Sequence, residues 1–94
     1  MSYPVYWTKE ANETFDLTIN FIEKQWGEKE AGKFINRTLK LLLTIAKHPY
    51  LFKASVSQNV RKGAISKQCS VFYEVHADKI IILFFWDNRQ EPIL

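Results

Sequence analysis

The side chains best suited to chemistry in this sequence are basic residues that stand among aromatic ones in its C-terminal half. The cations are Lys53, Arg61, Lys62, Lys67, Lys79 and Arg89, and the neighbouring ring side chains are Tyr73, His76 and Trp86. Lysine and arginine neutralise phosphates and aromatic planes stack on bases, so this set could bind a nucleic acid. The alternative is a solvated basic face, because cations scattered over a sheet surface are common.

Metal and nucleophile chemistry have few candidate residues. The metal-binding types are His48, His76 and Cys69, without a CxxC or HExxH motif, so we expect no metal site. Cys69 and His76 would lie on opposite faces of one strand, because side chains alternate along a strand. Cys69 is therefore interpreted as a small core residue. The three glycines are isolated and form no phosphate-binding loop, and we expect no cofactor.

Length and composition predict one folded domain spanning residues 1–94. The chain is 47% hydrophobic and 15% aromatic, which is enough for a real core, and its net charge of +3 is compatible with an acidic partner. A single cysteine cannot form an internal disulfide, which favours the reducing cytoplasm. The longest apolar run, residues 80–86, is too short to cross a bilayer, so no membrane role is expected.

The first half of the chain predicts a short strand followed by two helices. Residues 3–7 are aromatic and β-branched, as in an edge strand. Thr8 is a helix N-cap, the helix begins at about residue 9, and Trp26-Gly27 ends it. Apolar residues at helical spacing continue from Ala31 to Ala46, and Pro49 stops this second helix. Two helices joined by so few residues form an antiparallel hairpin.

The second half predicts a three-stranded antiparallel meander. Residues 69–76 alternate with period two, and residues 80–86 form an apolar run typical of a central strand. Residues 59–62 supply the third strand, with Gly63 as a candidate bulge. The order predicts an α+β fold with both helices on one face of the sheet. The residues expected to share its core are Phe15, Ile19, Ile22, Leu39, Leu42, Val71, Ile82 and Phe84.

Four segments resemble the RelE/ParE superfamily of bacterial toxins. They are VRK at 60–62, VFYEV at 71–75, IIIL at 80–83 and WDNRQEP at 86–92. The two preceding helices resemble the helical hairpin of that superfamily, so the resemblance spans essentially the whole chain. It implies a small cytoplasmic toxin that forms an oligomer with a cognate antitoxin, which wraps and neutralises it.

The resemblance also implies two kinds of target. RelE-like members cleave messenger RNA in the ribosome without a metal ion, whereas ParE-like members poison DNA gyrase and are not nucleases. Arg61 matches the strand arginine common across the family and Arg89 the arginine after the last strand, so these two are the candidate catalytic residues. We expect Arg61 to project from the sheet toward a partner or target. The candidate binding residues are Lys53, Lys62, Lys67, Tyr73, His76 and Asp87.

Two departures weaken the nuclease interpretation. Ser70 stands where RelE-like nucleases place an arginine, and the sequence reads Pro92-Ile93-Leu94 where they place a stacking tyrosine. Cleavage by a 2′-hydroxyl needs a proton acceptor, and an arginine stays protonated. The base would have to be His76, Glu74 or Asp87, and none of these occupies a position of the family motif.

The sequence therefore favours a ParE-like gyrase poison that inhibits growth. One alternative is a RelE-like ribosome-dependent mRNA endoribonuclease. The other is a non-toxic interaction module that has lost its active surface. In each case the expected antitoxin segment is amphipathic and acidic, since a basic sheet side next to apolar helix surfaces suits a chain that folds on binding. We expect the antitoxin segment to contact exposed apolar side chains of this protein at residues 50–52 and 93–94.

Overall fold

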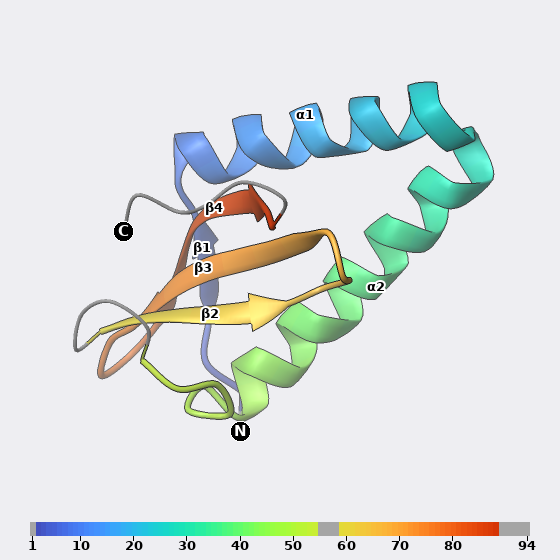
Figure 1. The fold of residues 1–94 in the computed structure, drawn as a ribbon. Coiled ribbons are helices and arrows are strands. Elements are labelled where there is room, and N and C mark those ends of the chain that lie inside the picture. Colours follow the sequence, from blue (N-terminus) through green and yellow to red (C-terminus); the bar gives the residue numbers. More distant parts are fainter. Residues whose placement is uncertain (1, 55–58, 89–94) are drawn as a thin grey trace.

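The computed structural model describes residues 2–54 and 59–88, and it contains two helices and a four-stranded sheet (Figure 1). Along the chain the elements are β1 (Val5–Trp7), α1 (Lys9–Trp26), α2 (Glu28–Lys47), β2 (Val60–Ala64), β3 (Cys69–Val75) and β4 (Ile80–Asp87). The α+β prediction is confirmed, with both helices packed against the sheet.

The sheet has the order β1-β4-β3-β2. The antiparallel pairing of β2 with β3 and of β3 with β4 is the predicted meander. The N-terminal strand β1 completes the sheet by pairing parallel to β4, with Val5 opposite Ile80. Gly63 lies in regular register opposite Val71, so the bulge predicted there is wrong. A Cβ at Gly63 would lie 3.1 Å from the Phe52 ring, and this close approach explains the glycine.

The bulge of the sheet lies in β4 instead. Phe72 pairs with Phe84 and Tyr73 with Ile82, which leaves Leu83 as the extra residue. Beyond Leu83 the alternation of faces therefore shifts by one position. The predicted core position of Phe84 is wrong for this reason: Phe84 stacks on Phe72, with ring centroids 4.8 Å apart, and Phe85 is buried in its place.

Two threonines of the N-terminal region bind the backbone at the bulge and two residues after it. The Thr8 hydroxyl donates to the carbonyl of Leu83 at 2.7 Å and accepts the backbone N–H of Ala11 at 3.0 Å as the predicted N-cap. The backbone N–H of Phe85 donates to the Thr14 hydroxyl at 2.9 Å. The bulge and the start of α1 are thus joined by hydrogen bonds, which fixes the helix over β4.

The two helices meet at Gly27 and diverge from there as the arms of a V that encloses the sheet (Figure 1). Gly27 has φ +93°, a conformation that favours glycine. The core between helices and sheet includes fully buried Ile45, Val71, Tyr73 and Ile82.

The predicted core face of α1 is confirmed by Phe15, Ile19 and Ile22, which are partly buried and pack against the core. On α2, Leu42 is buried as expected. Leu39 is 50% exposed, so its predicted core position is wrong. The apolar residues of α2 therefore divide into a buried side that includes Leu42 and an exposed side that includes Leu39.

Candidate functional site

Arg61 is held by the connection between α2 and β2. Its guanidinium Nη1 donates to the carbonyl of Phe52, and its Cζ lies 4.8 Å from the centroid of the Tyr50 ring. Among the described residues its Nε has no hydrogen-bond partner and is buried. An isolated bridge between Ala54 and Arg61 adds a backbone link. The structure therefore places Arg61 where it anchors this connection.

Tyr73 lies beside Arg61 in the sheet and is part of the core. It pairs with Arg61 across β2 and β3, is fully buried, and donates its hydroxyl to the carbonyl of Pro49 at 3.2 Å. Burial raises the pKa of the Tyr73 hydroxyl, and the positive charge of Arg61 opposes this in part. A buried, hydrogen-bonded tyrosine is unavailable to stack on a nucleotide.

His76 and Lys62 lie elsewhere on the sheet. His76 follows β3, and its Nε2 is 3.1 Å from a carboxylate oxygen of Glu74. Lys62 is exposed, and its Nζ lies 5.9 Å from the Phe72 ring centroid, on the face away from the helices. Lys53 is exposed in the connection before β2. These three side chains come from three different segments of the chain.

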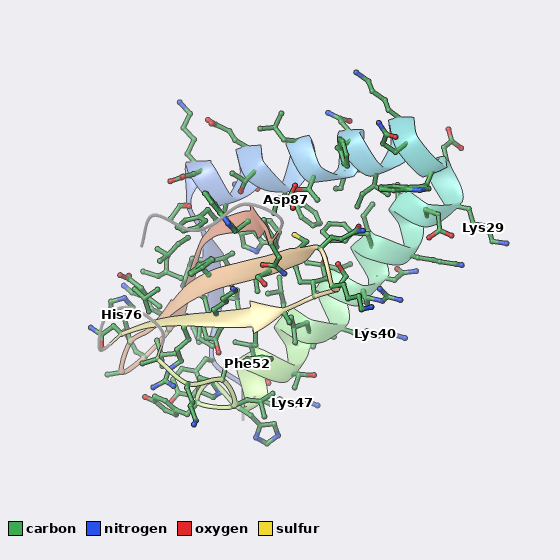
Figure 2. All side chains as sticks on the ribbon, in the orientation of Figure 1. Lys29, Lys40, Lys47, Phe52, His76 and Asp87 are labelled. Carbon is green, nitrogen blue, oxygen red and sulfur yellow. The ribbon has the colours of Figure 1, made fainter. Side chains whose placement is uncertain are left out.

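Lys67 and Asp87 lie at the opposite end of β3. Asp87 pairs with Cys69, at the start of β3, and the side chain of Asn88 donates to the Lys67 carbonyl at 3.3 Å. Figure 2 shows Asp87 and His76 at opposite ends of the sheet. Arg89, the second candidate catalytic arginine, lies outside the described residues. The members of the predicted set that the structure describes therefore lie in several places on the sheet and its connections.

Cys69 behaves as the small core residue expected of it. It is 5% exposed, and burial together with the charge of Asp87 raises the pKa of its thiol to about 11. The neutral thiol predominates at physiological pH, so it is a poor nucleophile.

The clearest concave apolar surface is a groove of about 530 Å³ beside the C-terminal half of α1. We call it the α1 groove. It is lined by Thr14, Leu17, Thr18, Phe21, Ile22, Trp26, Ser66, Gln68, Cys69, Phe85, Trp86 and Asp87. Leu17 is 68% and Trp26 is 52% exposed. Exposed aliphatic and aromatic side chains along a groove are typical of a protein-binding surface.

The sequence predicts that Trp26-Gly27 ends α1, and the groove was not predicted. The available signal was the width of the apolar stripe, because Leu17 and Phe21 extend it beyond what one contact with the sheet can cover.

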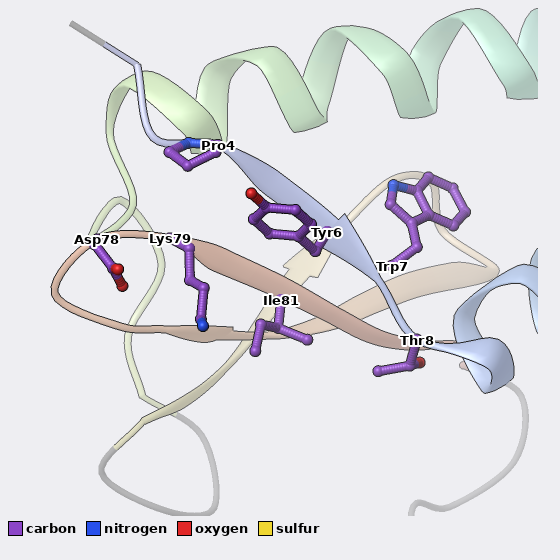
Figure 3. Close-up of a pocket in the computed structure, with 7 residues that line it drawn as sticks. All are labelled: Pro4, Tyr6, Trp7, Thr8, Asp78, Lys79 and Ile81. Carbon is purple, nitrogen blue, oxygen red and sulfur yellow. The ribbon is translucent and has the colours of Figure 1, made fainter.

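A second, more polar pocket of about 390 Å³ lies next to β1 and the start of β4 (Figure 3). Its lining includes the exposed ring of Tyr6 and the charged side chains of Asp78 and Lys79.

Two further properties bear on function. Within the described part of the chain, no three His, Cys, Asp or Glu side chains come together in a group able to hold a metal ion. None of the helices among residues 2–54 and 59–88 has the length and apolar character needed to cross a membrane.

Residues 5–92 match the family model for the ParE toxin of the type II toxin–antitoxin system parDE. Comparison with curated protein sequences gives no significant match.

Solved structures share the fold at low sequence identity. A chain of the chromosomal ParDE toxin–antitoxin system of P. aeruginosa superposes with a TM-score of 0.77 at 17% identity, over 92% of this chain and 96% of that one. The E. coli DinJ–YafQ toxin–antitoxin complex gives 0.65 at 7% identity, over 95% and 96%. The YoeB dimer of Staphylococcus aureus gives 0.63 at 14% identity, over 89% and 94%.

Proposed function

The chain belongs to the ParE toxin family of type II toxin–antitoxin systems, and from this membership we propose that it inhibits growth as a poison of DNA gyrase. The observation that carries this choice of target is the placement of Arg61 and Tyr73. Tyr73 is fully buried and Arg61 is partly buried, and both donate hydrogen bonds to backbone carbonyls of the connection after α2. A nuclease would need such groups at the surface, where they could reach a phosphate and a base.

The proton acceptors are also poorly placed for RNA cleavage. His76 and Asp87 lie at opposite ends of the sheet, separated by most of the length of β3. General acid and general base must both reach the scissile phosphate group, within hydrogen-bond distance or through one water. This separation supports inhibition by binding over catalysis.

A metal-independent endoribonuclease is the second candidate, and one observation favours it. His76 lies next to Glu74 near the surface, a pairing that can orient an imidazole for proton transfer. A cation is present on the neighbouring strand, where Lys62 pairs with Phe72, four residues before His76.

We assign the cognate antitoxin to the α1 groove. The solved relatives include the ParDE system and the DinJ–YafQ complex, both described as toxin–antitoxin assemblies. The groove offers exposed Leu17, Phe21 and Trp26 to the apolar face of an antitoxin segment. An amphipathic segment that folds on binding buries these side chains.

One experiment separates the functions. The protein is expressed from an inducible promoter in a bacterial host, and the purified protein is added to a gyrase supercoiling assay and to ribosomes programmed with mRNA. Growth arrest with loss of supercoiling supports the proposal. Growth arrest with mRNA cleavage supports the nuclease. Healthy growth, with neither activity, supports an interaction module without toxicity.

The antitoxin assignment has its own test. Phe21→Ser is expected to abolish rescue by the co-expressed antitoxin while toxicity persists, because it removes an apolar contact in the groove. Asn20→Ser is the matched control, since Asn20 is an exposed neighbour on α1 that does not line the groove. Full rescue of the Phe21→Ser variant would place the antitoxin elsewhere.

A further inference from the structure

The outer face of α2 combines exposed leucines with exposed cations. Leu39 is 50% and Leu43 is 66% exposed, and Arg37, Lys40 and Lys47 are exposed next to them. We call these five residues the basic α2 face. In Figure 2 the side chains of Lys40 and Lys47 extend away from the sheet. The face is separate from the α1 groove, which no α2 residue lines.

The spacing of these residues forms two parallel stripes along the helix. Leu39 and Leu43 are four positions apart, and Arg37, Lys40 and Lys47 follow at intervals of three and seven. Residues three, four or seven apart lie above one another on a helix. The leucines therefore form a short apolar ridge, and the cations form a line along one side of it.

The cations of this face form no ion pair with an acidic side chain of residues 2–54 and 59–88. No Asp or Glu occurs between Glu30 and Glu74, a stretch of 43 residues that contains eight Lys and Arg. Within residues 2–54 and 59–88 the ion pairs join Lys9 to Glu13, Lys33 to Glu30 and His76 to Glu74, and none involves Arg37, Lys40 or Lys47. The positive charge of this face is left for a partner to neutralise.

We propose that the basic α2 face docks an acidic amphipathic helix of a protein partner, a function additional to the proposed gyrase inhibition. Carboxylates at helical spacing would face the line of cations, and apolar residues of the same helix would cover Leu39 and Leu43. A nucleic acid backbone would meet the cations and leave the leucines exposed. A bilayer suits the face less well, because membrane anchoring scales with buried apolar area and two leucines bury little of it.

The test uses a synthetic peptide of about five helical turns, with leucines on one stripe and glutamates beside it. Binding of the labelled peptide to the full-length protein is measured by fluorescence anisotropy. We expect saturable binding that weakens with added salt, because solvent-exposed charges are screened. The double variant Lys40→Glu/Lys47→Glu should lower the affinity at least tenfold, and Leu39→Ser/Leu43→Ser should do the same.

The matched control is Lys9→Glu/Lys24→Glu, which makes the same charge change on exposed positions of α1. It should lower the affinity less than threefold. A peptide with lysines in place of the glutamates should bind the Lys40→Glu/Lys47→Glu variant better than the parent protein. This reversal shows that the variant is folded and that contact is direct.

Several results would overturn the proposal. The first is equal loss of affinity in the α1 control, which would show a response to net charge alone. The second is an unchanged affinity in the α2 variants. The third is tighter binding of duplex DNA or of phosphatidylglycerol vesicles with the same dependence on Lys40 and Lys47, which would assign the face to another class of ligand. None of these readouts requires toxicity, so growth arrest and gyrase inhibition stand or fall separately.

Discussion

At the scale of single residues, Arg61 is expected to contribute mainly to stability. Arg61→Ala removes a charged hydrogen bond to the Phe52 carbonyl and a contact with the Tyr50 ring, at a cost of about 1–3 kcal/mol. Urea unfolding measures this loss. Lys62→Ala on the same strand is the control, expected within about 0.5 kcal/mol of the parent because Lys62 is exposed. Equal stability of the two variants would show that Arg61 does not hold the connection.

Cys69 makes stability depend on pH in the alkaline range. The pKa of its thiol is about 11 in the folded protein against 9.0 for the free group, so the folded state holds this proton more tightly. Its contribution is complete below about pH 9 and is lost as the pH rises through 11, on the order of 2 kcal/mol. Unfolding free energies of the parent and of Cys69→Ala, compared across this range, should converge as the pH rises. Parallel pH profiles would contradict the prediction.

The residue types of the candidate site were readable from the sequence, but their directions were not. Arg61 and Tyr73 stand on neighbouring strands, and the sequence does not show that their side chains meet carbonyls of the connection at residues 49–52. Those contacts depend on the path of the connection between α2 and β2, and the sequence of this connection has no periodicity that would predict its path. Lone cations on a strand are therefore poor guides to a site.

At the scale of elements, the link between α1 and β4 is open to test through Thr14. Thr14→Val keeps the side-chain shape and leaves the backbone N–H of Phe85 without its acceptor. The expected cost is about 1–3 kcal/mol, since an unpaired buried donor loses its hydration without replacement. Thermal unfolding is the measurement. Thr44→Val is the control, because the Thr44 hydroxyl is exposed and donates to the Lys40 carbonyl of its own helix.

Local sequence patterns predict the helices and strands, but they do not predict the complete pairing of the strands in the sheet. Thr8, Gly27 and Pro49 mark the helix limits through capping and through the missing N–H of proline. The pairing of β1 with β4 joins residues 75 positions apart, and the bulge at Leu83 receives a hydrogen bond from Thr8 over the same separation. No local pattern encodes such contacts. The bulge then exchanged the faces expected for Phe84 and Phe85.

At the scale of the whole molecule, the single core predicts unequal effects for two leucines of α2. Leu42→Ala should cost about 2–5 kcal/mol, a large share of the stability of a small domain, because Leu42 belongs to the core shared by helices and sheet. Leu39→Ala should cost less than about 1 kcal/mol, since Leu39 is half exposed. Chemical unfolding of both variants checks the difference. A similar loss in both would mean that the outer face of α2 is buried in solution.

The position of β4 between β1 and β3 has a consequence for synthesis of the protein on the ribosome. β4 is the last strand of the described chain and the only one of these strands that pairs with β1. A nascent chain that has reached Lys79 holds both helices and one hairpin, without the strand that joins them. Such distant pairings slow folding and delay it until the last strand is made. Nascent chains stalled before β4 should be digested readily by protease, and protection should appear only in chains long enough to expose β4 outside the ribosome.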